Sequence, residues 1–89
     1  SPHKRPLRPL VEAALQNEQQ LLQAGIRRTE QRLRDFEKQY GLSSEQFLRR
    51  YENDEFDETL DFIEWVGEYR LLESMRAELD ILQEIHFED

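Results

Sequence analysis

Apolar residues between Leu7 and Tyr40 fall on one face of an α-helix. At 100° per residue they span an arc of about 100°, as in an amphipathic helix. The stripe consists of Leu7, Val11, Leu15, Leu22, Ile26, Leu33, Phe36 and Tyr40. Repeats at intervals of 11 residues correspond to about 3.67 residues per turn and favour a nearly straight helix over a left-handed supercoil. Prolines at positions 2, 6 and 9 and the glycine at 41 bound the pattern, so we expect a helix over about 10–40.

A second, short helix is expected over residues 44–52. Ser43 and Gln46 have the spacing of a capping box, in which each side chain bonds to the other residue's backbone N–H. Leu42 and Phe47 have the spacing of a hydrophobic staple across the same helix start.

The acidic connector over residues 53–57 leads into a third helix, expected over 58–86. Asp54 or Asp57 is expected to cap that helix, with Glu58 at its positive end. A calcium loop is not expected, because the connector lacks the required glycine and the terminal glutamate at the right spacing.

The third helix is apolar on two sides in its first half. One face carries Leu60, Ile63, Gly67 and Leu71, and the nearly opposite face carries Phe62, Trp65, Val66, Tyr69 and Leu72. Because apolar helix faces are normally buried and three helices can cover only one of these two, we expect the other face to need a second copy of the chain or another protein. The alternative is an unusually compact core within one chain. The second half of the third helix is ordinarily amphipathic and is expected to pack on the first helix. Gly25, in the first helix, lies where another helix can approach closely.

These elements predict an all-α protein of 89 residues, too short for a second core. A long N-terminal helix, a short middle helix and a long C-terminal helix are expected to pack as an antiparallel helical hairpin or a three-helix arrangement. Residues 1–9 form a basic, proline-rich arm, and residues 10–89 form one helical domain.

The net charge of −8 is unevenly distributed. Residues 1–40 carry eight basic and five acidic side chains, whereas residues 41–89 carry four and fifteen, a net charge of −11. An acidic surface repels phosphate and attracts basic proteins, although it also simply improves solubility. Nucleic acid is therefore not an expected partner, except through weak contact by the basic arm. The alternative is that the arm is only a frayed terminus.

The composition offers few residues for catalysis or for binding a cofactor. The chain has no cysteine, and its two histidines stand at positions 3 and 86. Asp61, Glu64 and Glu68 share one side of the third helix, but a dinuclear metal bundle would also need Glu-x-x-His elements. No phosphate-binding glycine loop or Ser–His–acid arrangement is present. No apolar run reaches the roughly 20 residues of a membrane span. We expect a cytoplasmic protein that is not an enzyme, with no metal, cofactor or membrane association.

Two blocks of sequence resemble small helical antitoxin-like proteins of prokaryotic type II toxin–antitoxin pairs, the TumA-like group. They are Tyr-Gly-Leu-Ser-Ser-Glu-Gln-Phe at 40–47 and Asp-Phe-Ile-Glu-Trp-Val-Gly-Glu-Tyr at 61–69, and the resemblance covers roughly residues 12–88. It implies a protein that binds and silences a toxin, an RNA-cleaving enzyme being one option, and it implies no catalytic residue. Many such antitoxins carry a DNA-binding module, but no helix-turn-helix with a basic recognition helix is evident here.

The candidate partner-binding residues lie in the acidic C-terminal half. Trp65, Tyr69, Phe62 and Val66 are expected to insert into an apolar groove of the toxin, because large aromatic side chains are frequent interface anchors. The remaining apolar candidates are Phe56, Leu60, Ile63 and Leu72, and the acidic candidates for basic groups of the toxin are Asp54, Glu55, Glu58, Asp61 and Glu64. The alternative is a homo-oligomeric structural or adaptor protein, whose second face is covered in a twofold dimer. The two are compatible, since antitoxins often dimerise.

Overall fold

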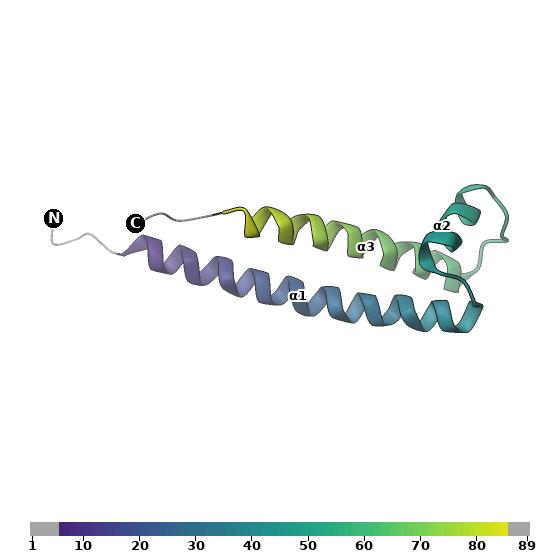
Figure 1. Cartoon of the computed structure of the whole chain (residues 1–89), viewed down its shortest axis with the longest axis horizontal. Helices are drawn as coiled ribbons and strands as arrows, with labels where there is room; N and C mark the ends of the chain where they lie inside the picture. Colours follow the sequence, from purple (N-terminus) through teal and green to yellow (C-terminus); the bar gives the residue numbers. More distant parts are fainter. Residues whose placement is uncertain (1–5, 86–89) are drawn as a thin grey trace.

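A computed structural model describes residues 6–85 (Figure 1). They form a hairpin of two long helices, and a short helix lies across one end of it. The helices are α1 (Leu7–Tyr40), α2 (Ser44–Glu52) and α3 (Leu60–Gln83), and this range contains no strand. α1 and α3 lie side by side and antiparallel, and α2 packs where the hairpin closes. The all-α, antiparallel arrangement predicted from the sequence is therefore confirmed.

The helix bounds differ from the expected ones at three points. α1 begins at Leu7, three residues early, because a proline in the first turn lacks only an N–H that has no partner there. α3 begins at Leu60 and ends at Gln83, so it is shorter than expected at both ends. The first five residues of the predicted arm and His86 lie outside the described residues.

The cap of α3 is Thr59, and the prediction of Asp54 or Asp57 is wrong. The hydroxyl of Thr59 accepts a hydrogen bond from the backbone N–H of Phe62 at 3.1 Å. Asp54 instead belongs to the end of α2: it has a left-handed backbone (φ 57°), and its N–H donates to the carbonyl of Tyr51.

The turn between α1 and α2 follows its sequence signals closely. Gly41 adopts the left-handed conformation (φ 69°) that ends α1. The Ser43 hydroxyl accepts from the Gln46 N–H at 3.1 Å, and the Gln46 side chain accepts from the Ser43 N–H at 3.3 Å, so the predicted capping box is present. Leu42 and Phe47 both pack into the hydrophobic core, which holds the entry to α2 in place.

The contact face of α1 follows a period of 3.5 residues. One row of its buried and half-buried positions has intervals that alternate between four and three residues, as in a coiled-coil pair. This row consists of Leu15, Gln19, Leu22, Ile26, Thr29, Leu33 and Phe36, and the buried Gly25 lies beside it. Leu22 with Leu33 and Leu15 with Ile26 keep the 11-residue spacing within this row, whereas Val11 is 45% exposed and lies outside it.

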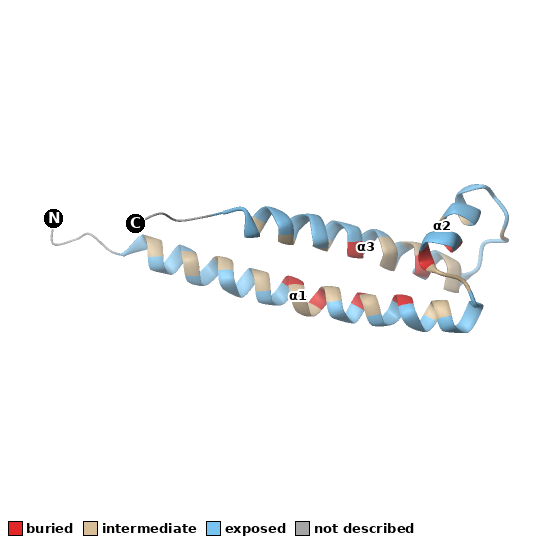
Figure 2. Ribbon diagram, viewed as in Figure 1, coloured by how far each residue is buried: buried red, intermediate tan, exposed pale blue. Residues whose placement is uncertain are grey.

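The core centres on Trp65, whose side chain is 0% exposed. Its ring stacks on Phe47 of α2 at 3.9 Å between centroids and 2° between planes, and on Phe36 of α1 at 5.4 Å and 12°. The indole N–H donates to the hydroxyl of Ser44 at 2.9 Å, so its polar edge is satisfied. Figure 2 shows the buried positions on the facing sides of α1 and α3 and on α2.

The chain itself covers the tryptophan face, which was expected to insert into a partner. α1 and α2 cover this face, which consists of Phe62, Trp65, Val66, Tyr69 and Leu72. The chain is not the unusually compact core of the alternative, because it covers only one of the two apolar faces of α3. The opposite face remains exposed, with Leu60 at 80%, Ile63 at 51% and Leu71 at 48% of their full exposure.

The two helical glycines differ in their surroundings. A Cβ added to Gly25 would lie 2.8 Å from the sulfur of Met75, so α3 approaches α1 closely there, as the sequence suggested. A Cβ added to Gly67 would meet nothing within 4 Å. Within the described chain, close packing therefore explains the glycine at 25 and not the one at 67.

We expect Ser44→Ala to lower the free energy of unfolding by about 1–3 kcal/mol, because it leaves the buried indole N–H of Trp65 without an acceptor. Ser74→Ala, at an exposed position of α3, is the matched control and should change it by less than about 0.5 kcal/mol. Urea unfolding followed by circular dichroism measures both. Equal stability of the two variants would show that the indole hydrogen bond contributes little.

We expect Gly67→Ala to stabilise the fold by about 0.5–1 kcal/mol, because alanine favours helix and the site is open. Gly25→Ala should gain less than this or lose stability, because its methyl group must displace Met75. Thermal unfolding of the two variants makes the comparison. Equal gains at both positions would contradict the close approach of α3 to Gly25.

Candidate protein-docking surface

The structure separates the eight apolar candidates into core and surface residues. Trp65 and Leu72 are buried, and Phe56, Phe62, Val66 and Tyr69 are half-buried against the same core. Only Leu60 and Ile63 are exposed. In this conformation Trp65 cannot enter a partner's groove without leaving its own core, so the expected role of the tryptophan face as an accessible anchor is wrong. The helical periodicity had identified two faces but not which one α2 covers.

Three of the five acidic candidates are engaged within the chain. Glu55 pairs with Arg50, Glu58 accepts a hydrogen bond from the Tyr51 hydroxyl, and Asp61 accepts one from the Tyr40 hydroxyl. Asp54 and Glu64 make no side-chain hydrogen bond or ion pair with the described residues. These two carboxylates are therefore the ones whose charge is least neutralised by the fold.

The tyrosine–carboxylate pairs shift the ionisation of both phenols. The hydrogen bond to Asp61 raises the pKa of Tyr40 above its ordinary value of 10.0, with smaller effects from desolvation and the carboxylate charge. The hydrogen bond to Glu58 raises the pKa of Tyr51 in the same way. Each pair joins two different segments near the closed end of the hairpin. The stability of that end should therefore depend on pH in the alkaline range.

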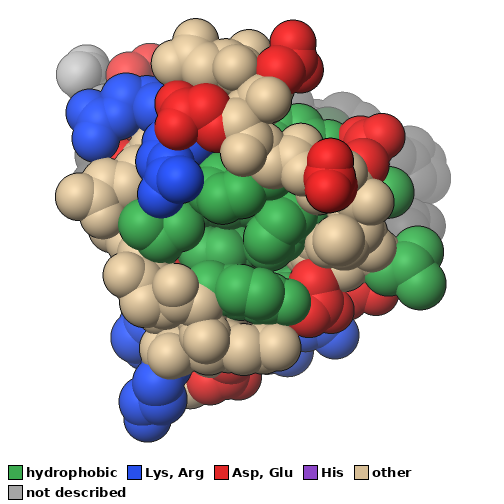
Figure 3. Space-filling model, turned by 90° about the vertical axis from the view of Figure 1, so that its right-hand side faces the viewer, with side chains coloured by type: hydrophobic (Ala, Val, Ile, Leu, Met, Phe, Trp, Pro, Cys, Tyr) green, Lys and Arg blue, Asp and Glu red, His purple; other side chains and the backbone are tan. Residues whose placement is uncertain are grey.

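The end face of the hairpin at α2 carries hydrophobic side chains in its middle and charged side chains on its rim (Figure 3). The phenylalanine rings at this end pack on one another. The centroid of the Phe47 ring lies 5.2 Å from that of Phe62 and 5.6 Å from that of Phe56. The Arg50 guanidinium lies over the Phe56 ring at 4.7 Å. The rings are thus largely engaged with each other, which leaves limited area for a partner.

The outer face of α3 presents a row of accessible apolar side chains. We call Leu60, Ile63, Gly67 and Leu71 the outer stripe. Their spacings of three and four residues place them on one side of the helix, and the opposite side packs into the core. Single exposed apolar residues are normal, but a row of them on one helix face is typical of an interaction site.

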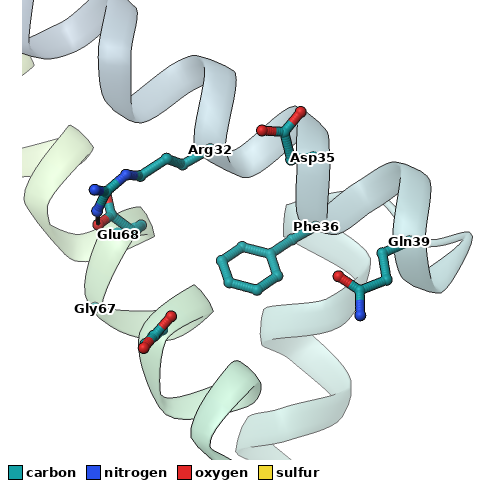
Figure 4. Close-up of a pocket in the computed structure, with 7 residues that line it drawn as sticks. Arg32, Asp35, Phe36, Gln39, Gly67 and Glu68 are labelled. Carbon is teal, nitrogen blue, oxygen red and sulfur yellow. Dashed lines mark hydrogen bonds and ion pairs between the residues drawn. The ribbon is translucent and has the colours of Figure 1, made fainter.

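A hollow of about 580 Å³ adjoins the outer stripe between α1 and α3 (Figure 4). Its lining consists of Arg32, Asp35, Phe36, Gln39, Glu64, Gly67 and Glu68. The Phe36 ring lies in the space between the two helices, and Arg32 and Glu68 form an ion pair of 2.6 Å on one side of it. Gly67 belongs to both the hollow and the outer stripe, so the two form one continuous surface.

Sequence reasoning missed the α1 side of this hollow. Arg32, Asp35 and Gln39 were not candidates, because they meet α3 only after the hairpin closes. The one local signal was Gly67, a helical glycine with no evident reason to be there.

Two other kinds of site were sought among the described residues. Within 6–85, no group of three or more histidine, aspartate or glutamate side chains is placed to hold a metal ion. No helix in that range is both long and apolar enough to cross a membrane.

Comparison with known proteins does not extend this picture. No protein-family model, curated protein or solved structure matches the chain. The resemblance to antitoxin-like proteins therefore stays an expectation from the two sequence blocks.

We expect the tyrosine–carboxylate pairs to stabilise the fold at neutral pH and to lose this effect in alkali. Because both pKa values are raised by folding, the stabilisation is fully present below pH 10 and is lost as the pH rises through the raised values. Tyr40→Phe combined with Tyr51→Phe should therefore be less stable than the wild type at pH 7. The difference should narrow above pH 10, as measured by urea unfolding across that range. A difference independent of pH would contradict the assignment.

Proposed function

We propose that this protein is a protein-binding module that acts as an antitoxin, silencing a toxin by direct contact through the outer stripe. The observation that carries the proposal is the exposure of Leu60, Ile63 and Leu71 on one face of a helix whose other face is filled by the core. This exposed face replaces the tryptophan face as the candidate anchor surface.

The energetics of the outer stripe favour docking. Fully burying a leucine or isoleucine side chain contributes about 1.5–3 kcal/mol. The stripe lies on a helix held by the Trp65 stack, so binding does not require this segment to order itself first. A preorganised apolar row of this kind suits a partner that also presents a rigid apolar surface.

The charge of the C-terminal half favours a basic partner. Its net charge of −11 attracts basic surfaces and raises the encounter rate at low salt. A toxin that binds RNA presents basic groups for phosphate, and these groups would suit the acidic residues beside the stripe. The two sequence blocks that resemble antitoxins support the same proposal.

A homo-oligomeric adaptor is the second candidate, and the length of the exposed row favours it. The spacing of the outer stripe continues through Ser74 and Glu78 to Ile81, which is 61% exposed. A twofold antiparallel pairing of α3 helices would cover this row in both copies. Against this, each copy carries a net charge of −8, which opposes self-association.

We expect Ile63→Asp to abolish neutralisation of a toxic protein encoded beside this chain, because it places a charge in the centre of the docking face. Ala77→Asp adds the same charge to an exposed position of α3 outside the outer stripe and should neutralise as the wild type does. Growth of cells that co-express the toxic protein with each variant measures the effect. Circular dichroism of each variant establishes that the fold is retained.

Full neutralisation by Ile63→Asp would exclude the outer stripe as the docking face. Sedimentation of the isolated chain tests the second candidate. A stable dimer that Ile63→Asp dissociates, with no effect on any toxic neighbour, would favour the adaptor.

A further inference from the structure

The hollow beside the outer stripe has open space where a helix residue normally has a side chain. Gly67 is on α3, and a Cβ built on it meets nothing within 4 Å. The hollow is lined by residues of α1 and α3 and by none of α2, so the short helix does not close it. A partner lying along the outer stripe would therefore pass directly over an unfilled volume of about 580 Å³.

The glycine is unfavourable for the helix and has no compensating contact within the described chain. Gly25 shows what such compensation looks like, because the sulfur of Met75 occupies the space that its Cβ would take. No atom has this role at Gly67. A group from outside that enters the hollow would supply the missing contact.

The charges around the hollow select the kind of group. Three carboxylates, Asp35, Glu64 and Glu68, line it together with one guanidinium. That guanidinium, on Arg32, is already paired with Glu68 at 2.6 Å. Asp35 accepts a hydrogen bond from the neutral Gln31 side chain at 3.0 Å, and Glu64 has no partner among the described residues. Two negative charges therefore remain without a counter-ion, which favours a cation.

The aromatic ring that lines the hollow indicates which kind of cation would fit. The Phe36 ring stacks with Trp65 in the core and also lines the hollow. Aromatic rings attract cations, and planar guanidinium groups stack on them. An arginine side chain combines a planar cation that accepts two carboxylates with a long apolar stem that can cover a ring.

We propose that the hollow is a recognition pocket for an arginine side chain, carried by a basic helix of the partner that lies along the outer stripe. The guanidinium contacts Glu64 and Asp35, and its stem covers Phe36. The inference rests on the proposed function in that the outer stripe supplies the rest of the contact. A second copy of this chain is a poorer occupant, because it carries a net charge of −8 and the hollow already has carboxylates that lack a counter-ion.

The small probe for this pocket is acetyl-arginine amide, titrated into the ¹⁵N-labelled intact chain and followed by nuclear magnetic resonance. We expect saturable shifts at the amide of Gly67 and its neighbours, with a dissociation constant on the order of millimolar. The matched probe is acetyl-citrulline amide, which has nearly the same shape without the charge. It should bind at least about tenfold more weakly, as one lost charge pair in such a pocket implies.

Variants of the chain test the lining directly. Glu64→Gln should weaken binding of acetyl-arginine amide about tenfold, because it removes the unpartnered carboxylate. Gly67→Gln should abolish binding by filling the hollow. Asp80→Asn makes the same change of charge at an exposed position of α3 outside the hollow and should leave binding within about twofold.

The result that overturns the inference is equal binding of the two probes, no shift at Gly67, or equal effects of Glu64→Gln and Asp80→Asn. A chain dimer that Gly67→Gln dissociates and that acetyl-arginine amide does not affect would identify a second copy as the occupant and also overturn it. Failure of the proposed function is distinguishable from this. Arginine would then bind in the hollow as described, while Ile63→Asp left neutralisation intact.

Discussion

The stacking of Trp65 on Phe36 and Phe47 is the interaction on which the rest of the structure depends, because it joins all three helices at one point. α2 has only nine residues and is too short to be stable as an isolated helix. Its position follows from the capping box at its start, from the Phe47 ring on the indole, and from the hydrogen bond that Ser44 accepts from the indole N–H. The hydrophobic core of this elongated hairpin is therefore concentrated at its closed end.

The orientation of the indole also determines which face of α3 is free. With Trp65 turned towards α1 and α2, the residues half a turn away must point outwards, and these include Leu60, Ile63 and Leu71. The docking face is thus a consequence of how the core is built and is held as rigidly as the core. The far end of the hairpin is packed less tightly: Leu7, Leu10 and Ile81 are all more than half exposed. Stability should decrease along the hairpin from the closed end, because buried apolar contacts decrease in that direction.

Local signals in the sequence identified the helices and the turn between the first two, whereas non-local packing decided the site. Helical periodicity, Gly41 and the capping box of Ser43 act over a few residues, so they could be interpreted directly. The cap of α3 was missed because a left-handed residue at Asp54 extends the turn after α2 and moves the helix start to Thr59. The face of α3 was misassigned because its coverage depends on where α2 folds back. The preference of tryptophan for interfaces pointed to the face that turned out to be the core. The hollow joins Phe36 to Gly67, 31 positions apart, and no pattern within one helix could reveal it.

The distribution of paired and unpaired carboxylates is more informative about a partner than the net charge. Glu55, Glu58 and Asp61 each bond to a side chain of another element or turn near the closed end, so their charges contribute to holding that end together. Glu64 lies one turn after Asp61 on the same helix, yet it faces a hollow in which the only guanidinium is already paired. A uniformly acidic surface would attract a basic protein from any direction. An unpaired carboxylate beside an accessible apolar row favours one approach, because only there does a basic helix gain both apolar burial and a charge pair.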